Sequence, residues 1–512
     1  MHLWEVLRKA VLAGYFVKNY QRKKSLMTKN AWDLIQVMVK SGKTKEVIQS
    51  AKIPGGSKWA SFAVPIFETP RYTVPKYTAE EFVRDGISEA QVSASDFEQE
   101  AARAKKYLGE SLTEYLTDKK KELGKKEKKG PTDDRRLIYT FGMNDHGQLG
   151  YGDKSAPLPP KSLSIFNGLE IVGIGVGKSH SCVLIKGGDL FSWGSADCGE
   201  LGNANLKGSI LPNRAEALKK YRISAVDCGD GYTVVVSHEG AVIVVGANDV
   251  GQLGIGEFSP YSHIPIELDH FHDIPIASVY CGTNSTFACA KSGTFFAWGG
   301  NECGQLGLGD QVNRPYPEEL KAINGGDMRH FSAGASHCIF ADTNGNCWLW
   351  GSNSRGQCGF EQTEPACYLT PTKHPLLSRL NVIQGACGDT HSLVIVESRS
   401  KFALRNVYSF GNGEEGRLGM NSTEDSRTPL CVEYLRNDSV QLVACGAKHS
   451  IAVSSDGKIF TWGDGSMGQL GHAGHFFFNR KVTPKALAVN VSSVSILKAT
   501  FAHSVFASGK EQ

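Results

Sequence analysis

Along residues 137–508 the apolar positions fall into short runs rich in β-branched residues, separated by glycine-containing turns. Runs such as 182–185, 233–236 and 451–453 have the length and composition of β-strands. A tight hairpin is predicted after most of these runs, and a second strand then ends in an aromatic-Gly pair. The predicted hairpin turns are Glu239-Gly240, Ser292-Gly293, Asn344-Gly345 and Asp456-Gly457. The pattern predicts a series of small antiparallel sheets of four strands each.

These sheets are copies of one repeat, which occurs seven times. An aromatic-Gly pair, with Val in place of the aromatic residue once, is followed by a tetrad similar to Gly-Gln-Leu-Gly. The pair glycines recur at an almost constant spacing, with one longer step before the sixth copy, and are Gly142, Gly194, Gly246, Gly299, Gly351, Gly411 and Gly463. A Gly-x-x-His motif has the same period, with intact copies at 177–180, 334–337, 388–391 and 446–449 and degenerate copies at 229–232, 282–285 and 500–503.

The repeat predicts a closed ring. One such sheet cannot bury both of its faces alone, whereas seven sheets arranged radially bury them against each other. We therefore expect an all-β fold, a seven-bladed β-propeller, over residues 137–512. The strand at 137–141 has no Gly-x-x-His motif before it, and the element at 495–507 has no aromatic-Gly strand after it. We expect the first strand to complete the C-terminal blade.

Residues 1–136 have a different pattern and form a predicted N-terminal extension, mainly helical and extended. Residues 2–20 place apolar side chains at helical spacing, residues 54–75 are rich in Pro and aromatic residues, and residues 78–123 consist mostly of helix formers. A basic linker at 119–129 leads into the propeller, and its last lysines are Lys125, Lys126, Lys128 and Lys129. We expect this arm to become ordered on a partner or across the propeller face.

The charge is distributed unevenly between these two regions. Residues 1–136 carry 27 Lys and Arg against 18 Asp and Glu, a net charge of +9, whereas the remaining residues carry 29 against 34, a net charge of −5. The propeller is therefore not expected to be a general nucleic-acid binder. Segment 1–60 carries 12 Lys and Arg and three acids, which is typical of a mitochondrial targeting segment. Nucleus and cytoplasm are the alternatives. No apolar run is long enough for a transmembrane segment.

The cysteines and histidines suggest structural roles. All 13 cysteines lie at or after Cys182, and no Cys-x-x-Cys occurs, which predicts free buried thiols rather than disulfides or zinc. The motif histidines, one in each of five repeats, are expected to bond to backbone rather than share a metal ion, and are His180, His337, His391, His449 and His503. We also find no phosphate-binding loop, nucleophile elbow or His-Glu-x-x-His motif. The sequence predicts no metal, no cofactor and no enzymatic activity.

Two departures from the repeat are candidate partner contacts. In the longer step before the sixth copy, Arg399, Lys401 and Arg405 form a basic loop suited to an acidic partner or to RNA phosphate; the alternative is a solvated hairpin extension. Near the C-terminus, Phe476, Phe477 and Phe478 precede Arg480. Three consecutive Phe cannot all face one core, so we expect at least one to dock a partner; the alternative is burial against the N-terminal segment.

The paired motifs resemble those of the regulator of chromosome condensation family, whose fold is a seven-bladed β-propeller. Its members include nucleotide-exchange factors, photoreceptors, ubiquitin-ligase modules and mitochondrial assembly proteins. The resemblance to exchange members implies a GTPase contact at Asp230, but Asn284 and Thr390 replace their Asp and His, and no wedge insertion fits between Gly246 and Gly299. The tryptophan cluster of the photoreceptors is absent, because Trp193, Trp298, Trp350 and Trp462 are the repeat aromatics.

Together these features predict a non-enzymatic propeller scaffold that binds protein partners in a larger assembly. Family analogy suggests a mitochondrial ribosome or respiratory complex. Guanine-nucleotide exchange on a small Ras-like GTPase, with Asp230 among the contacts, is the first alternative. A chromatin- or RNA-associated propeller that binds through the basic linker is the second.

Overall fold

The computed structural model describes residues 137–156, 159–323, 325–362, 364–398, 405–472, 480–489, 491 and 493–508. The predicted N-terminal extension lies outside the described residues, and with it Lys125, Lys126, Lys128 and Lys129 of the basic linker. Arg399, Lys401 and the three residues Phe476, Phe477 and Phe478 also lie outside them. The predictions for these segments stay predictions.

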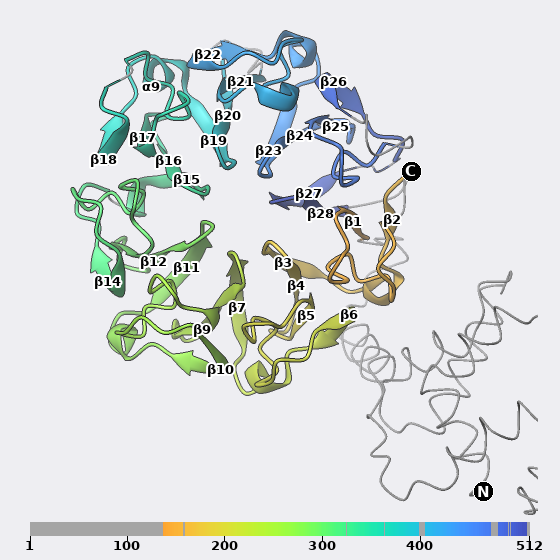
Figure 1. The fold of residues 1–512 in the computed structure, drawn as a ribbon, viewed down its shortest axis with the longest axis vertical. Coiled ribbons are helices and arrows are strands. Elements are labelled where there is room, and N and C mark those ends of the chain that lie inside the picture. Colours follow the sequence, from red (N-terminus) through yellow and green to blue (C-terminus); the bar gives the residue numbers. More distant parts are fainter. Residues whose placement is uncertain are drawn as a thin grey trace, which may run out of the picture. The chain divides into compact units, whose positions relative to one another are not determined.

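Seven four-stranded antiparallel sheets stand in a ring (Figure 1). The inner strands line a central channel. This arrangement confirms the predicted all-β, seven-bladed propeller. We number the sheets as blades 1 to 7, and blade 1 contains the first and last described strands. Among the described residues, no helix is both long enough and apolar enough to cross a membrane.

The first four blades contain the following strands, with the innermost strand named first. Blade 1 is made of β27 (Val494–Thr500), β28 (His503–Ser508), β1 (Ile138–Gly142) and β2 (Lys161–Ser162). Blade 2 is made of β3 (Ile171–Val176), β4 (His180–Ile185), β5 (Leu190–Gly194) and β6 (Ser209–Arg214). Blade 3 is made of β7 (Ile223–Cys228), β8 (Tyr232–Ser237), β9 (Val242–Ala247) and β10 (Tyr261–Glu267). Blade 4 is made of β11 (Ile276–Cys281), β12 (Ser285–Ala290), β13 (Phe295–Gly299) and β14 (Arg314–Glu319).

The other three blades follow the same order. Blade 5 is made of β15 (Met328–Ala333), β16 (His337–Asp342), β17 (Cys347–Ser352) and β18 (Cys367–Lys373). Blade 6 is made of β19 (Val382–Cys387), β20 (His391–Glu397), β21 (Arg405–Gly411) and β22 (Ser426–Cys431). Blade 7 is made of β23 (Val440–Cys445), β24 (His449–Ser454), β25 (Ile459–Gly463) and β26 (Lys481–Ala486). The helical pieces are η1 (Ser164–Phe166), η2 (Glu216–Leu218), η3 (Asp269–Phe271), η4 (Gly325–Asp327), α9 (Leu377–Leu380), η5 (Glu414–Gly416) and η6 (Glu433–Leu435).

The ring is closed by contacts at its centre and by a pairing within blade 1. The inner strands contact each other in the cyclic order β3, β7, β11, β15, β19, β23, β27 and back to β3. Strand β1 pairs antiparallel with β28, from Ile138 opposite Ala507 to Gly142 opposite His503. This pairing joins the two ends of the propeller in one sheet without a covalent link.

Each motif has a fixed place in a blade. The first strand leads into the Gly-x-x-His loop, and the third strand ends in the aromatic-Gly pair and the tetrad loop, so both loops lie at one end of the channel, which we call the mouth end. The hairpin turns lie at the far end. The pair glycines need their left-handed backbone: Gly142 has φ +112°, and a side chain there would collide with the carbonyl oxygen of Ala502.

Two sets of hydrogen bonds tie each blade to the next. The buried indole of a repeat tryptophan donates to a tetrad carbonyl of the preceding blade, as in the 3.0 Å bond from Trp298 to Gln252. Each motif histidine places Nε2 near a hydroxyl of the following blade, for example His337 2.8 Å from Ser392. Ser392 in turn donates to the Gln357 carbonyl at 2.7 Å. The histidines therefore form a buried interblade belt, but the expected bonds to backbone are wrong, because Nε2 of each lies near a side-chain hydroxyl of the next blade.

Candidate functional site: the mouth of the central channel

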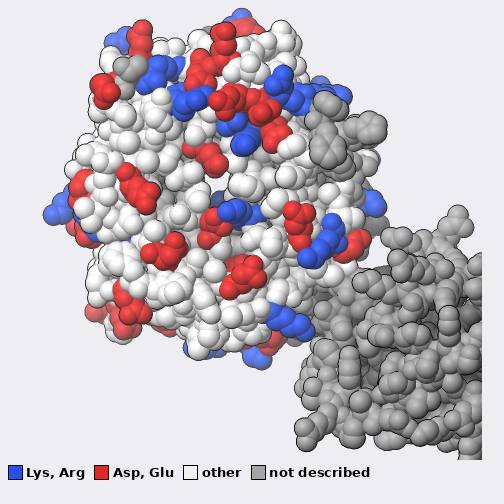
Figure 2. Space-filling model, viewed as in Figure 1, with Lys and Arg blue, Asp and Glu red and all other residues white. Residues whose placement is uncertain are grey.

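The central channel contains a cavity of about 400 Å³ at its mouth end. Its wall consists of the last residues of the inner strands and the Gly-x-x-His loops of the seven blades. In the space-filling view, basic and acidic side chains lie next to one another around the hollow at the centre of the ring (Figure 2). This mouth combines enclosure, charge and contributions from every blade, so it is the candidate functional site.

The loops that form the mouth are joined by backbone hydrogen bonds. Successive blades exchange bonds from an N–H of one loop to a carbonyl of the next: Asp230 to Thr283 at 2.9 Å, Thr283 to Gly334 at 3.2 Å, Ala335 to Gly388 at 3.3 Å, and Ala447 to Phe501 at 2.9 Å. Because these bonds fix one loop against the next, the mouth is a stiff rim rather than a set of independent loops.

Asp230, the predicted GTPase contact, lies on this rim in an ion pair. Lys178 Nζ is 3.0 Å from Asp230 Oδ2, and both side chains are partly exposed. The same ammonium lies 5.2 Å from the centre of the Phe501 ring, a cation–π distance. Phe501 itself is 41% exposed. A partner that used Asp230 would have to compete with Lys178 for the carboxylate.

A second ion pair crosses the channel below the rim. Lys498 on β27 places Nζ 3.0 Å from Asp227 Oδ1 on β7, and the blade that contains β3 lies between these strands. Burial lowers the pKa of Lys498, but the charge and hydrogen bond of Asp227 outweigh it and leave that pKa raised. Asp227 also accepts the Cys281 N–H at 3.0 Å. The raised pKa keeps the Lys498 ammonium charged at neutral pH, and the ion pair occupies it.

A buried arginine occupies the blade 6 side of the mouth. Arg417 is 3% exposed, and it donates from Nε to the Glu414 carbonyl at 2.8 Å and from Nη1 to Thr390 Oγ1 at 3.2 Å. Burial raises the pKa of the nearby Asp389 carboxyl, against the opposing charges of Arg417, Lys448 and Lys178. The Thr390 hydroxyl is therefore already used in holding the mouth together.

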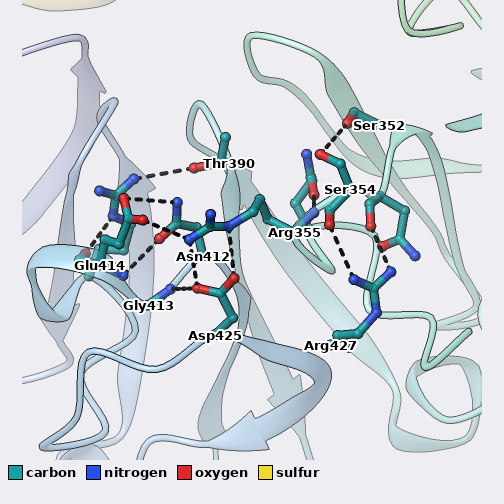
Figure 3. Close-up of polar contacts among 12 residues, drawn as sticks. Ser352, Ser354, Arg355, Thr390, Asn412, Gly413, Glu414, Asp425 and Arg427 are labelled. Carbon is teal, nitrogen blue, oxygen red and sulfur yellow. Dashed lines mark hydrogen bonds and ion pairs between the residues drawn. The ribbon is translucent and has the colours of Figure 1, made fainter. Parts of the chain in front are cut away.

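Polar contacts also join the tetrad loop of blade 5 to blade 6 (Figure 3). Arg355 places Nε 2.7 Å from Asp425 Oδ2 and Nη2 2.8 Å from Glu414 Oε1. Arg427 donates to backbone carbonyls of the same loop, including that of Asn353 at 2.9 Å. These contacts hold the two blades together and occupy most of the hydrogen-bond donors of Arg355 and Arg427.

The structure brings some of the candidate residues together and separates others. Asp230, Asn284 and Thr390 lie on the mouth loops of blades 3, 4 and 6, as the resemblance implies. Arg405 lies elsewhere, paired across the hairpin with Glu397 at 3.1 Å. Arg480 lies 3.9 Å from Glu415 of the preceding blade. Arg405 and Arg480 are thus partly engaged within the propeller.

Some residues of the mouth were missed by the sequence analysis. Arg417 had a signal, because it stands in a tetrad where most copies have Gln. The pair of Lys498 with Asp227 had none, because the two residues are 271 positions apart. Phe501 lies in a degenerate copy of the Gly-x-x-His motif, and only the fold places it on the rim.

One group of described side chains offers three possible metal ligands. A ring nitrogen of His180 and the sulfurs of Cys182 and Cys228 all lie within 4.8 Å of one another, and the residues are buried. His180 Nε2 lies 2.9 Å from Thr233 Oγ1, the same bond that the other motif histidines make. Burial raises the pKa of Cys228 well above its ordinary value, which keeps the thiol protonated. This group is part of the interblade belt.

Comparison with known proteins gives one family. The model of the RCC1-like domain matches residues 137–506. The ultraviolet-B receptor UVR8 of Arabidopsis thaliana is 31% identical over 336 residues, which cover 65% of this chain and 74% of the receptor. The probable E3 ubiquitin-protein ligase HERC6 of Homo sapiens is 31% identical over 318 residues, and the match spans only 30% of that ligase.

Solved structures show the same fold. Human WBSCR16 superposes with a TM-score of 0.62 at 20% identity, covering 74% of this chain and 99% of WBSCR16. Prp20p of Saccharomyces cerevisiae, which was studied for its binding to Gsp1p and histones, superposes with a TM-score of 0.64 at 19% identity, covering 74% of this chain and 93% of Prp20p. At these identities the likeness concerns the fold alone.

Proposed function

Because this chain belongs to the RCC1-like domain family, we propose that its propeller is a non-enzymatic platform that holds a protein partner over the mouth of the channel. In this proposal the platform is a subunit of a larger assembly. The rim of blades 7, 1 and 2 is the observation that supports it most directly. Exposed Lys448 and Phe501 and partly exposed Lys178 come from three successive loops, and the backbone bond from Ala447 to Phe501 holds the first two loops together.

This rim suits an acidic segment that carries an apolar side chain. Two lysines beside an exposed aromatic ring offer charge attraction and a surface for burial in the same place. An acidic segment would compete with Asp230 for the Lys178 ammonium, whereas Asp227 is already paired with Lys498. A stiff rim with few free acids fits binding better than acid–base chemistry.

We place the assembly in the mitochondrion, as a ribosome or a respiratory complex. The basic, acid-poor segment 1–60 supports this setting. Subcellular fractionation of the endogenous protein tests the compartment. Recovery in the nuclear or cytosolic fraction, with none in mitochondria, would contradict the mitochondrial part of the proposal and leave the docking surface to be tested separately.

Substitution of the rim should release the partner. We expect a Lys448→Glu, Phe501→Ala double variant to lower recovery of the co-purifying assembly by about tenfold or more, because it reverses a charge and removes the aromatic contact. The measurement is quantitative mass spectrometry of the tagged protein purified from cells. Lys291→Glu is the matched control, since Lys291 is exposed in a hairpin turn at the far end of the propeller. Equal losses from both variants, or from neither, would rule out docking at the mouth.

Guanine-nucleotide exchange is a second candidate function, favoured by the place of Asp230 on the mouth and by the fold shared with Prp20p. Under the platform proposal, neither the wild type nor Asp230→Ala accelerates nucleotide release from small GTPases. The measurement is release of a fluorescent guanine nucleotide from a panel of GTPases. Acceleration by the wild type that Asp230→Ala abolishes, and that Asp273→Ala retains, would establish exchange instead; Asp273 is 94% exposed near the far end.

A further inference from the structure

The tetrad loop of each blade packs on the outer strand of the next blade, and the glycines fix the register of this contact. A side chain on Gly356 would lie 2.5 Å from the Cα of Arg427, and one on Gly416 would lie 2.5 Å from the Cα of Val482. The equivalent distance from Gly304 to the Cα of Leu369 is 3.1 Å. The three junctions between blades 4 and 5, 5 and 6, and 6 and 7 therefore have the same alignment.

This alignment creates a recurring pair of positions. The first position is the residue before the first tetrad glycine. The second position, on the next blade, lies two residues before the outer-strand residue that this glycine contacts. At the junction of blades 5 and 6 these positions are Arg355 and Asp425, which form an ion pair at 2.7 Å (Figure 3). At the junction of blades 6 and 7 they are Glu415 and Arg480, an ion pair at 3.9 Å with the charges reversed. Both pairs bridge neighbouring blades near the surface.

At the junction of blades 4 and 5 the same two positions are Cys303 and Cys367. Both are free cysteines and both are partly exposed, in contrast to the eight that are buried. The register of Gly304 against Leu369 sets the two cysteines at facing positions of neighbouring blades. Burial raises the pKa of the Cys303 thiol, and the nearby Cys367 raises it further. The general expectation that all the cysteines are buried is therefore wrong for this pair.

We propose that Cys303 and Cys367 are an oxidisable pair that forms a disulfide between blades 4 and 5. The alignment sets them at the same facing positions that hold ion pairs at the next two junctions, and partial exposure lets an oxidant reach the sulfurs. The oxidant is a low-molecular-weight disulfide such as oxidised glutathione.

The reaction consists of two thiol–disulfide exchanges. The thiolate of one cysteine attacks the small disulfide, forms a mixed disulfide and expels one thiolate. The thiolate of the second cysteine then attacks the protein sulfur of that mixed disulfide and expels the other small thiolate. The two protons of the cysteine thiols are taken up by the two small thiolates. One small disulfide is reduced to two thiols, and one protein disulfide is formed.

The crosslink places a covalent bond where the next two junctions have an ion pair. The loop that it closes runs from Cys303 to Cys367 and includes most of blade 5, so the bond restricts a long segment of the unfolded chain. We expect oxidation to raise Tm by about 5 °C, reversibly on addition of dithiothreitol.

The chain supplies a matched control in Cys198. It occupies the position before the tetrad glycine in blade 2 and is also partly exposed. The alignment, in which Gly199 lies against His263, places Tyr261 at the opposite position of the next blade. Cys198 therefore has the same loop environment without a thiol partner, and we expect it to form at most a mixed disulfide.

The test treats the full-length chain with oxidised glutathione and maps disulfides by mass spectrometry of non-reduced peptides. We expect a peptide crosslinked through Cys303 and Cys367 and loss of maleimide labelling at both residues. Cys198 should either remain labelled or carry a single glutathione. Cys303→Ser and Cys367→Ser should each abolish the crosslink and the Tm rise, whereas Cys198→Ser should preserve both. Separate glutathione adducts on Cys303 and Cys367, or a Tm rise that survives Cys303→Ser, would overturn the proposal.

Discussion

Replacement of Trp298 by Ala should lower the free energy of unfolding by about 4 kcal/mol, the largest effect we expect from a single substitution outside the glycines. Trp298 is fully buried, and its core cluster contains side chains of both blade 3 and blade 4. Its ring centre is 5.8 Å from that of Phe271, and its indole N–H donates to the Gln252 carbonyl at 3.0 Å. The substitution therefore leaves a cavity and removes one interblade hydrogen bond at the same junction, although the Gln252 carbonyl still accepts the Thr286 hydroxyl at 2.7 Å.

Equilibrium denaturation of the propeller measures this effect. Trp298→Phe keeps most of the buried volume and loses the hydrogen bond, so we expect a cost of about 1–2 kcal/mol. Trp348→Ala is the control, because Trp348 is only partly buried and lies outside the repeat position. Equal costs for Trp298→Ala and Trp348→Ala would show that the interblade belt contributes no more than ordinary packing.

The free energy of unfolding of the propeller should begin to fall as the pH drops below about 6.5, at a higher pH than that at which ordinary carboxylates titrate. Burial lowers the pKa of His337 to about 3, that of His449 to about 4 and that of His503 to about 3. In the belt, Ser392 donates its hydroxyl to a carbonyl, so His337 must donate from Nε2 to that hydroxyl. Nδ1 of each of these histidines then has no hydrogen-bond partner among the described residues, and a proton added there would be buried without an acceptor.

The direction of the pH dependence follows from these lowered values. The unfolded chain takes up protons on these histidines below about pH 6.5, whereas the folded chain does not until about pH 4 or lower. The stabilisation is complete above pH 6.5 and is lost as the pH falls, by roughly 1.4 kcal/mol for each pH unit and each such histidine. We expect Tm to fall by more than about 10 °C between pH 7 and pH 4.5.

Thermal unfolding at a series of pH values tests this expectation. His337→Leu should lower Tm at pH 8, because it removes the bond to Ser392, and should flatten the slope of Tm against pH below 6.5. His272→Gln should leave the profile unchanged, since His272 is 85% exposed. A Tm that stays constant from pH 7 to pH 5 in the wild type would contradict the role given to the belt.

The fold could be predicted because the turns and strands of each repeat are specified by residues within that repeat. Glycines at fixed positions predict turns, and β-branched runs between them predict strands. A sheet with two apolar faces needs neighbours on both sides, and seven copies provide them. The role of the histidines also followed from their recurrence in equivalent places, since such residues lie in separate blades.

The candidate contacts were harder to predict, because a charge in a loop does not show which partner it has. Arg480 was interpreted as a partner contact, yet Glu415 of the preceding blade lies beside it. Cys303 and Cys367 were grouped with the buried thiols, but their positions at a blade junction leave them partly exposed. In both cases the deciding neighbour comes from an adjacent blade.

The number of blades, the order of strands within each blade and the lack of familiar catalytic motifs can be derived from the amino-acid sequence alone, because they depend on patterns within a single repeat and on its recurrence. The folded ring was needed to show that Lys498 meets Asp227 and that Cys303 and Cys367 take facing positions at a blade junction. Those meetings depend on the closure of the ring and on the register between neighbouring sheets. Closure and register arise from packing over the whole propeller, and no local segment encodes them.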